Sequence, residues 1–152
     1  MTKQEPRTSV GGKEMETWEV TPNVSVGGIR FGMSRAELRA LFGDEYEVFR
    51  KPNFSENTTD DYHRFHVYYT PEDLVESVMV FYGEGIELTL DGTVIFPVEK
   101  AKVEEVMPGI TGDEDYPTDY QRSIGYGEDA GEEDELFDFI LIGREGYFNT
   151  MH

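Results

Sequence analysis

Short apolar runs that end at turn residues are the feature that most limits how this chain can fold. The clearest example is a pair of alternating runs, Glu87–Leu90 and Thr93–Phe96, joined by Asp91-Gly92. Asp-Gly suits the tight type I′ turn that connects antiparallel strands. Before this hairpin, we expect a central strand over Leu74–Tyr82, because its part Val78–Tyr82 is apolar on both faces. We therefore expect a mostly antiparallel sheet.

Other segments predict further strands around this hairpin. Their alternation of apolar and polar residues is that of a half-buried strand. Pro52–Asp61 is rich in Asn, Ser, Thr and Asp, so we interpret it as a loop. We assign Phe65, Tyr69 and Phe81 to the core. The strand-like segments are Val24–Phe31, Tyr46–Phe49, His63–Tyr69, Ser123–Tyr126 and Leu136–Ile142.

Two helices are expected between the strands. Ser34 and Glu37 have the spacing of a capping box, in which each side chain accepts the backbone N–H of the other residue. Gly43 is then expected to end this helix. A second helix is predicted to open at Pro97, because proline at the first helical position loses no hydrogen bond, and to end at Pro108-Gly109. The expected fold class is α+β, a mostly antiparallel sheet with two short helices packed on one face.

The first helix also carries a resemblance. Its Gly-Met-Ser start at Gly32, its Glu37-Leu38 pair and its Leu41-Phe42-Gly43 end are similar to the helix start of β-lactamase-inhibitor-like folds. The same element occurs in the small lipoprotein of the outer-membrane β-barrel assembly machine and in other small bacterial proteins. The resemblance covers about a dozen residues and implies a helical layer on an antiparallel sheet, used to bind another protein. The chain differs from these proteins because it has no Cys for lipidation and no second copy of the motif.

An excess of acidic residues limits the material from which a core can be built. The 152 residues include 13 Lys+Arg against 32 Asp+Glu, a formal net charge of -19. The 10 Phe, 9 Tyr and one Trp offset this shortage, because each large ring buries about 150–250 Å². We expect a single domain over residues 17–152, preceded by a disordered leader over residues 1–16.

Composition excludes several classes of protein. No uncharged run approaches the ~20 apolar residues of a membrane span, and no apolar segment at the N-terminus marks a secreted protein, so we expect a cytoplasmic location and no membrane partner. With no Cys, neither disulfide bonds nor thiolate chemistry is available. The net charge of -19 opposes nucleic-acid binding, since phosphates recruit Lys and Arg.

The acidity is concentrated in residues 111–135, which carry ten Asp/Glu and one Arg. Tyrosines lie among these acids, and tyrosine is enriched where proteins meet. The same rings also serve as core in a chain short of Leu, so both interpretations stay open. A partner of this region is expected to be a basic protein, because opposite charge speeds association. The candidate partner-binding residues are Asp113, Glu114, Asp115, Tyr116, Tyr120, Tyr126, Glu132, Glu133 and Asp134.

Residues suited to catalysis or metal binding are few. His63 and His66 are three apart on a predicted strand and so are expected on opposite faces, and His152 is the last residue. The acidic segments lack the ligand spacing of a Ca²⁺ loop, and no nucleophile or phosphate-binding motif occurs. We predict no catalytic residue, no metal site and no cofactor.

Our leading hypothesis is a non-enzymatic acidic module that binds a basic partner protein, as an inhibitor or an immunity protein does. The alternative is a small-molecule-binding or hydrolytic α+β domain whose acidity is an adaptation for solubility or high salt. A third interpretation, a decoy that mimics DNA, needs acids along one long face. The concentration of acids in 111–135 favours the first hypothesis, because salt adaptation spreads acids over the whole surface.

Overall fold

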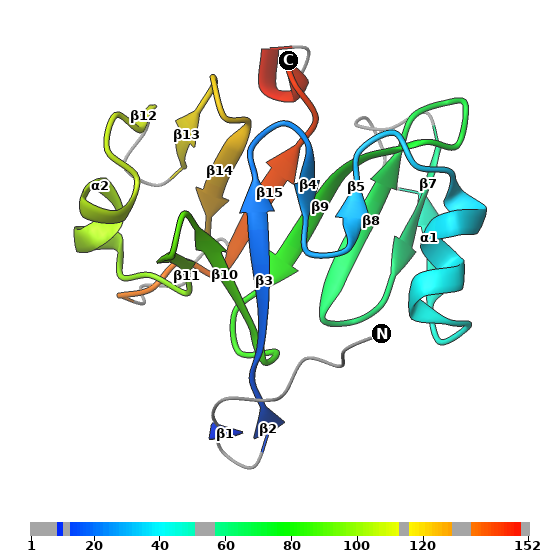
Figure 1. Cartoon of the computed structure of the whole chain (residues 1–152), viewed down its shortest axis with the longest axis horizontal. Helices are drawn as coiled ribbons and strands as arrows, with labels where there is room; N and C mark the ends of the chain where they lie inside the picture. Colours follow the sequence, from blue (N-terminus) through cyan, green and yellow to red (C-terminus); the bar gives the residue numbers. More distant parts are fainter. Residues whose placement is uncertain (1–8, 11–12, 51–56, 113–115, 129–134, 150–152) are drawn as a thin grey trace.

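Two β-sheets share one hydrophobic core in the computed structural model of the chain (Figure 1). The structure describes residues 9–10, 13–50, 57–112, 116–128 and 135–149. The smaller sheet has five strands in the order β11 (Thr93–Phe96), β10 (Ile86–Leu90), β3 (Glu16–Thr21), β4 (Ser25–Val26) and β5 (Ile29–Arg30).

The larger sheet has eight strands, and every neighbouring pair in it is antiparallel. In the smaller sheet, β3 and β10 run parallel and the other pairs are antiparallel. The expectation of a mostly antiparallel arrangement is confirmed, although the strands form two sheets instead of one. The order in the larger sheet is β12 (Thr111–Gly112), β13 (Pro117–Asp119), β14 (Ile124–Gly127), β15 (Phe139–Gly143), β9 (Val75–Phe81), β8 (Phe65–Tyr69), β7 (Thr58–Asp61) and β6 (Glu47–Arg50).

The segment expected to be a disordered leader contains regular structure in its described part. β1 (Ser9–Val10) and β2 (Lys13–Glu14) form an antiparallel pair, and Glu16 begins β3. The remaining residues of the segment, 1–8 and 11–12, lie outside the described part. The division of the chain at residues 16 and 17 stays a prediction.

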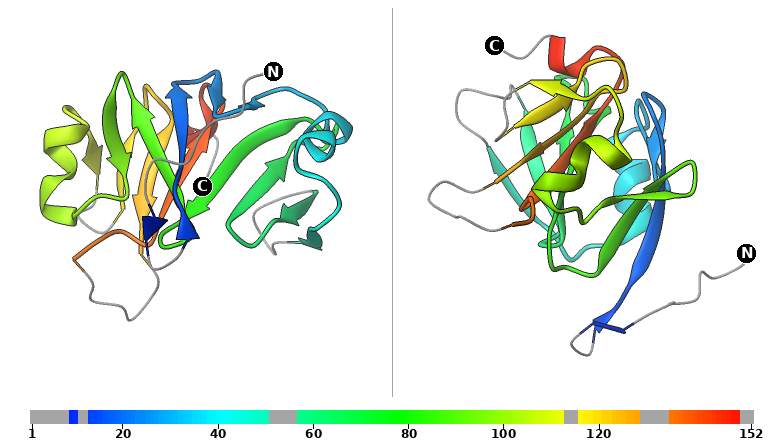
Figure 2. Two further views of the ribbon diagram at one scale, coloured as in Figure 1. Left: turned by 60° about the horizontal axis from the view of Figure 1, so that its bottom comes forward. Right: turned by 90° about the vertical axis from the view of Figure 1, so that its left-hand side faces the viewer.

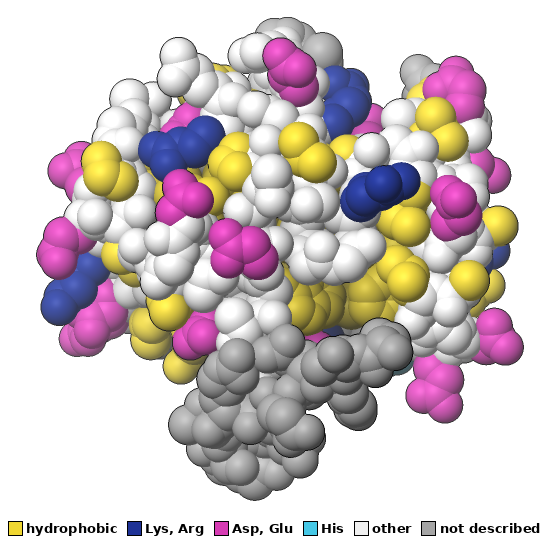
Figure 3. Space-filling model, in the orientation of Figure 1, with side chains coloured by type: hydrophobic (Ala, Val, Ile, Leu, Met, Phe, Trp, Pro, Cys, Tyr) yellow, Lys and Arg dark blue, Asp and Glu magenta, His cyan; other side chains and the backbone are white. Residues whose placement is uncertain are grey.

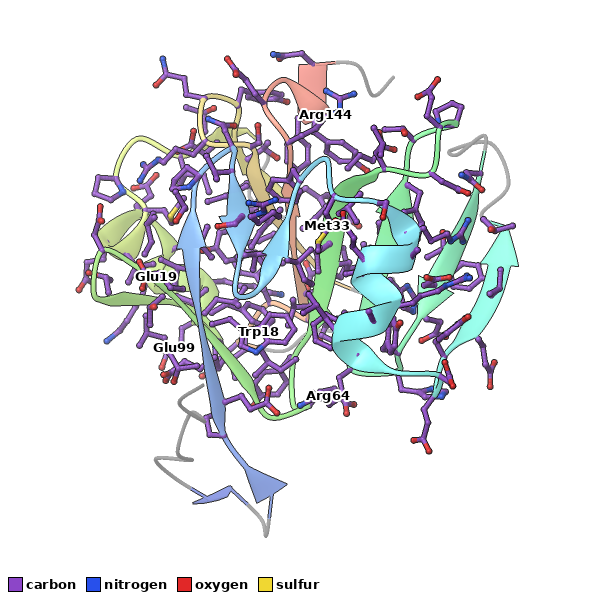
Figure 4. All side chains as sticks on the ribbon, turned by 45° about the vertical axis from the view of Figure 1, so that its right-hand side comes forward. Trp18, Glu19, Met33, Arg64, Glu99 and Arg144 are labelled. Atoms are coloured by element: carbon purple, nitrogen blue, oxygen red, sulfur yellow. The ribbon has the colours of Figure 1, made fainter. Side chains whose placement is uncertain are left out.

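Aromatic rings join the two sheets. Trp18 of β3 meets Phe65 of β8 with their ring centroids 5.2 Å apart, and Phe42 contacts both rings, 5.0 Å from Phe65 and 6.1 Å from Trp18. Figure 4 shows Trp18 on β3. Phe65 and Tyr69 are buried, as predicted. Phe81 is only partly buried, and its assignment to the core is wrong, because its neighbour Val80 takes the inward position and turns Phe81 to the outer face.

The first helix forms where the sequence predicts it. In α1 (Arg35–Phe42), the backbone N–H of Glu37 donates to the Ser34 hydroxyl at 3.1 Å, and the Ser34 N–H donates to the Glu37 carboxylate at 2.9 Å. Gly43 ends the helix at a φ of 86°, a conformation that favours glycine. The capping box is therefore confirmed.

The second helix starts later than predicted. A 3₁₀ turn, η1 (Lys100–Lys102), leads into α2 (Val103–Val106), while Pro97 stays outside the helix. The cause is a tertiary contact, since the Phe137 N–H donates to the Val98 carbonyl and Glu99 bridges to Leu136, which holds this segment extended. A last 3₁₀ turn, η2, covers Tyr147–Asn149.

The two helices lie at opposite ends of the long axis (Figures 1 and 2). α1 forms ion pairs with β7 of the eight-stranded sheet through Arg35 and Arg39, whereas α2 contacts β11 of the five-stranded sheet. These contacts do not establish that both helices pack on one face, which stays a prediction.

Two strand assignments need correction. The segment 24–31 is a hairpin, β4 and β5, and not a single strand, because Gly27 takes a positive φ of 59° and turns the chain. The predicted loop 52–61 contains β7 in its second half, since Thr58–Asp61 pairs with both β6 and β8. Its first half, 52–56, lies outside the described residues.

Candidate functional site

The candidate site lies at one end of the eight-stranded sheet. Because neighbouring strands are antiparallel, the start of one strand lies beside the end of the next. Backbone hydrogen bonds join the strand ends here. The Tyr82 N–H donates to the Asp138 carbonyl, and the Asp138 N–H donates to the Gly127 carbonyl. We call this end of the sheet the acidic end. It comprises Asp61, Tyr82, Glu84, Tyr116, Glu128 and Asp138.

The predicted acidic region adjoins this end. The Tyr116 hydroxyl donates to the Glu128 carbonyl at 3.5 Å, so the residues that flank the segments 113–115 and 129–134 are in contact. The Glu128 carboxylate also forms an ion pair with Lys100. The predicted partner-binding acids, which lie outside the described residues, are Asp113, Glu114, Asp115, Glu132, Glu133 and Asp134.

The three candidate tyrosines do not form one surface. Tyr116 is 50% exposed at the acidic end, whereas Tyr120 follows β13 at the opposite end and packs edge-on against Phe148. Tyr126 is only 2% exposed, and its hydroxyl donates to the Ile95 carbonyl at 2.8 Å. Burial raises the pKa of Tyr126 above its ordinary value. Of the two interpretations left open for Tyr126, the structure supports the core, because a ring buried in this way cannot reach a partner.

The outer face of the eight-stranded sheet carries large apolar side chains. Phe139 and Phe81 face each other across β15 and β9. Phe139 also covers Gly127 of β14, where an added Cβ would lie 2.3 Å from the ring. A side chain on Gly127 would therefore displace Phe139, so the glycine makes room for an aromatic ring at the acidic end.

An open pocket of about 360 Å³ occupies the acidic end between β7, β9 and β15. Carboxylates and rings share its wall, and the carboxylates come from segments far apart in the sequence. Its lining residues are Asp61, His63, His66, Phe81, Tyr82, Glu84 and Asp138.

His66 occupies an aromatic part of this wall. Its ring lies 5.2 Å from that of Phe49 and 4.8 Å from that of Phe81, both in edge-to-face geometry. Its Nε2 lies 3.3 Å from a carboxylate oxygen of Asp61. The Tyr68 ring lies 6.3 Å away, so neighbouring rings and the Asp61 carboxylate together position the imidazole.

The expectation that His63 and His66 point to opposite faces is wrong. β8 begins at Phe65, so strand alternation does not apply to His63, which sits in the preceding turn with a φ of 72°. The His63 N–H donates to the Asp61 carboxylate at 2.7 Å, and both histidines line the pocket. In the part of the chain that the structure describes, no three His, Asp or Glu side chains gather closely enough to hold a metal ion. His152 lies outside that part.

A second cluster of charged groups is buried on the inner side of the sheet. The Asp60 side chain is fully buried, and Arg39 binds it with two hydrogen bonds of 2.9 and 2.7 Å. Arg35 binds it at 3.1 Å, and the Tyr69 hydroxyl donates to it at 2.7 Å. The guanidinium of Arg35 also lies over the Tyr69 ring, 4.2 Å from its centroid.

The pKa of Asp60 follows from a competition between burial and these donors. Burial by itself raises the pKa of the carboxyl, but the hydrogen bonds from Arg39, Tyr69 and Arg35 hold it below its ordinary value. Asp60 is therefore ionised, and its charge is balanced by Arg35 and Arg39. Because these donors come from α1 and β8, the cluster joins the helix to the sheet.

Comparison with protein-family models, curated proteins and solved structures gives no match. None of the described helices has both the length and the apolar composition needed to cross a membrane.

Proposed function

We propose that the protein is a non-enzymatic binding module whose acidic end engages a basic partner protein, as an inhibitor or an immunity protein does. The observation that carries the proposal is the meeting of exposed rings and carboxylates at one end of the sheet. Tyr82, 47% exposed, lines the pocket with Asp61 and Asp138, and Tyr116, 50% exposed, contacts Glu128 at the same end. Tyrosines of this kind serve as anchors in protein interfaces, and carboxylates steer a cationic partner.

Described basic residues pair with carboxylates at both ends of the sheet. Arg122 and Arg144 lie at the opposite end of the sheet, where each pairs with a carboxylate, Asp119 and Glu76 respectively. Figure 4 shows Arg144 at the far end of the molecule from Arg64. Arg64, near the acidic end, pairs with Glu16. Lys100 likewise pairs with Glu128 there, so the attraction of a cationic partner to the acidic end depends on the predicted acids of residues 111–135.

The alternative function keeps one observation in its favour. Figure 3 shows Asp and Glu side chains on both flanks of the visible face. Such a distribution is expected when acids serve solubility or adaptation to high salt, with a small-molecule or hydrolytic site elsewhere. We favour the binding module because the pocket lies where the predicted acidic region adjoins the sheet. A cytoplasmic location, and the helical layer implied by the resemblance to β-lactamase-inhibitor-like folds, belong to the same proposal.

The test is capture of a partner from the native host at low and at high salt, followed by calorimetric titration of the purified partner. We expect capture at low salt of a protein with a basic surface. A double variant, Tyr82→Ala with Tyr116→Ala, should weaken binding by about 30-fold, the effect of losing one interface hot spot or more. The matched control, Tyr120→Ala, changes an equally exposed tyrosine at the opposite end and should bind as the parent protein does. The proposal would be contradicted if the double variant and the Tyr120→Ala control lost partner binding equally, or if the captured partner were acidic.

A further inference from the structure

β6 forms one edge of the eight-stranded sheet. Among the described strands it pairs with β7 alone, so its other side is open. Alternate residues of an antiparallel strand direct both N–H and C=O to the same side, so half of β6 presents these groups on the open side. The other edges of the two sheets are less suited to pairing, because β5 and β12 have two residues each and α2 contacts β11. β6 is therefore the edge best able to receive another strand.

The carboxylates along this edge have no counter-charge. Asp44, Glu45 and Glu47 are exposed, and none of them forms an ion pair or a side-chain hydrogen bond with a described residue. The register of β6 and β7 also places Glu47 directly opposite Asp61. Like charges in directly opposite positions destabilise a sheet. A cation beside Glu47 would relieve this repulsion.

Charge decides which kind of strand fits the edge. A second copy of the chain would bring the same carboxylates to the junction together with its net charge of -19, so the two edges would repel each other. A strand that carries Lys or Arg is attracted instead. Strand alternation puts Glu47 and Val48 on different faces, and Val48 is 49% exposed. A cation opposite Glu47 and an apolar residue opposite Val48 are thus the matching cross-strand pairs.

Resting on the function proposed above, we propose that β6 receives an extended basic segment of the partner as a ninth strand of the sheet. The main chain of the segment pairs with the open groups of Glu47–Arg50. In this mode of recognition, backbone hydrogen bonds supply affinity and alternate side chains supply specificity. Asp44 and Glu45, which precede β6, add negative charge. Because Glu47 lies opposite Asp61, the added strand reaches the acidic end.

The direct probe is a hexapeptide of alternating lysine and valine, added to the full-length protein. Hydrogen exchange of the backbone amides, followed by ¹⁵N NMR, is the readout. We expect protection of the β6 amides that face the open side. At a free peptide concentration of about ten times Kd, their exchange should slow about tenfold, because only the unbound fraction exchanges. The control is the same peptide with every backbone nitrogen methylated, which keeps the charge but donates no main-chain hydrogen bond. It should give no protection.

A variant of the edge gives the second readout. Glu47→Gln should weaken binding of the lysine–valine peptide about two- to fivefold, the range expected for an exposed ion pair. The variant should melt at or above the temperature of the parent protein, since it removes the repulsion from Asp61. The matched control, Glu145→Gln, removes an exposed carboxylate at the opposite end of the sheet and should leave peptide binding unchanged.

Several results would overturn the inference. They are equal protection by the methylated peptide, protection located away from β6, no protection at all, or equal peptide binding by Glu47→Gln and the parent protein. Protection of the open side of β6 in the concentrated protein without peptide would mean that a second copy occupies the edge, which would also overturn it.

These outcomes are separate from the fate of the proposed function. A captured basic partner whose binding depends on Tyr82 and Tyr116, but which leaves the β6 amides unprotected, would retain the binding module and remove the role of the edge. Protection of β6 by the peptide, without any basic partner from the host, would have the reverse meaning.

Discussion

Asp60 joins α1 to the eight-stranded sheet through buried ion pairs. Its buried carboxylate accepts hydrogen bonds from two arginines of one helix and from a tyrosine of the sheet. A buried charge is tolerated only when it is paired and hydrogen-bonded in this way. Removing the carboxylate therefore leaves two guanidinium groups without their buried counter-charge.

We predict that Asp60→Asn lowers the free energy of unfolding by about 3–5 kcal/mol, the usual effect of breaking a buried ion pair from one side. Urea unfolding followed by circular dichroism measures this. Asp73→Asn is the control, because Asp73 also pairs with Arg35 but is 56% exposed. This variant should lower the free energy of unfolding much less. Equal losses in the two variants would mean that Asp60 is not specially stabilising. If Asp60→Asn does not fold, Tyr69→Phe removes one donor and should give an intermediate loss.

The same residue predicts a pH dependence. Because the pKa of Asp60 is lower in the folded protein than in the unfolded chain, its stabilisation is present above the unfolded pKa of about 3.9. It is lost as the pH falls below that value and through the folded pKa. The difference in unfolding free energy between the parent protein and Asp60→Asn should thus be constant near neutral pH and shrink below about pH 4. A difference that grew on acidification would contradict the assignment.

Single residues were the hardest features to predict. Asp60 falls in Thr58–Asp61, a strand without any apolar residue, so composition assigned it to a loop. The strand exists because its neighbours β6 and β8 supply hydrogen bonds on both sides. His63 was misplaced for a related reason: the periodicity argument is valid only inside a strand, and β8 begins two residues later.

Among the elements, α1 was predictable because its signals are local. The capping box and Gly43 involve residues within one or two turns of each other. We predict that Ser34→Ala lowers the free energy of unfolding by about 1 kcal/mol, because an N–H of the first turn loses its acceptor. Ser34→Asp retains an acceptor and should unfold like the parent protein in the same urea titration. If Ser34→Ala and the parent protein unfold alike, the serine contributes no cap in solution.

The hairpin of β10 and β11 was predictable on the same grounds. Asp91 and Gly92 take φ values of 52° and 83°, and the turn residues that favour such values are rare enough to be recognised. β9 was identified as a central strand from its apolar run and does lie between β8 and β15. The start of α2 was not predictable, because the contact of Val98 with Phe137 overrides the signal of Pro97.

At the scale of the whole molecule, the candidate site could not be derived from the sequence. The pocket draws on three segments, around residues 61–66, 81–84 and 138, and only the strand order of the folded sheet brings them together. What the sequence does show is the concentration of charge in residues 111–135. That segment meets the pocket end of the sheet at Tyr116 and Glu128.

The last prediction separates steering from anchoring at this end. Steering acts over long distances and anchoring acts only in contact, so the two change different rate constants. Neutralising the predicted acids to Asn and Gln should slow association with the basic partner by about tenfold or more at low salt and flatten its salt dependence, while dissociation stays the same. The acids to be changed are Asp113, Glu114, Asp115, Glu132, Glu133 and Asp134.

Tyr116→Ala should act in the opposite way, by speeding dissociation about fivefold or more with little change in association, as expected when an interface residue that contributes more than about 1 kcal/mol is truncated. Tyr120→Ala, at the far end of β13 against Phe148, should alter neither rate constant. Surface plasmon resonance over a series of salt concentrations measures all three proteins against the same partner. An unchanged association rate in the acid-neutralised protein at low salt would show that these acids do not steer the partner. Their charge would then be better explained by solubility.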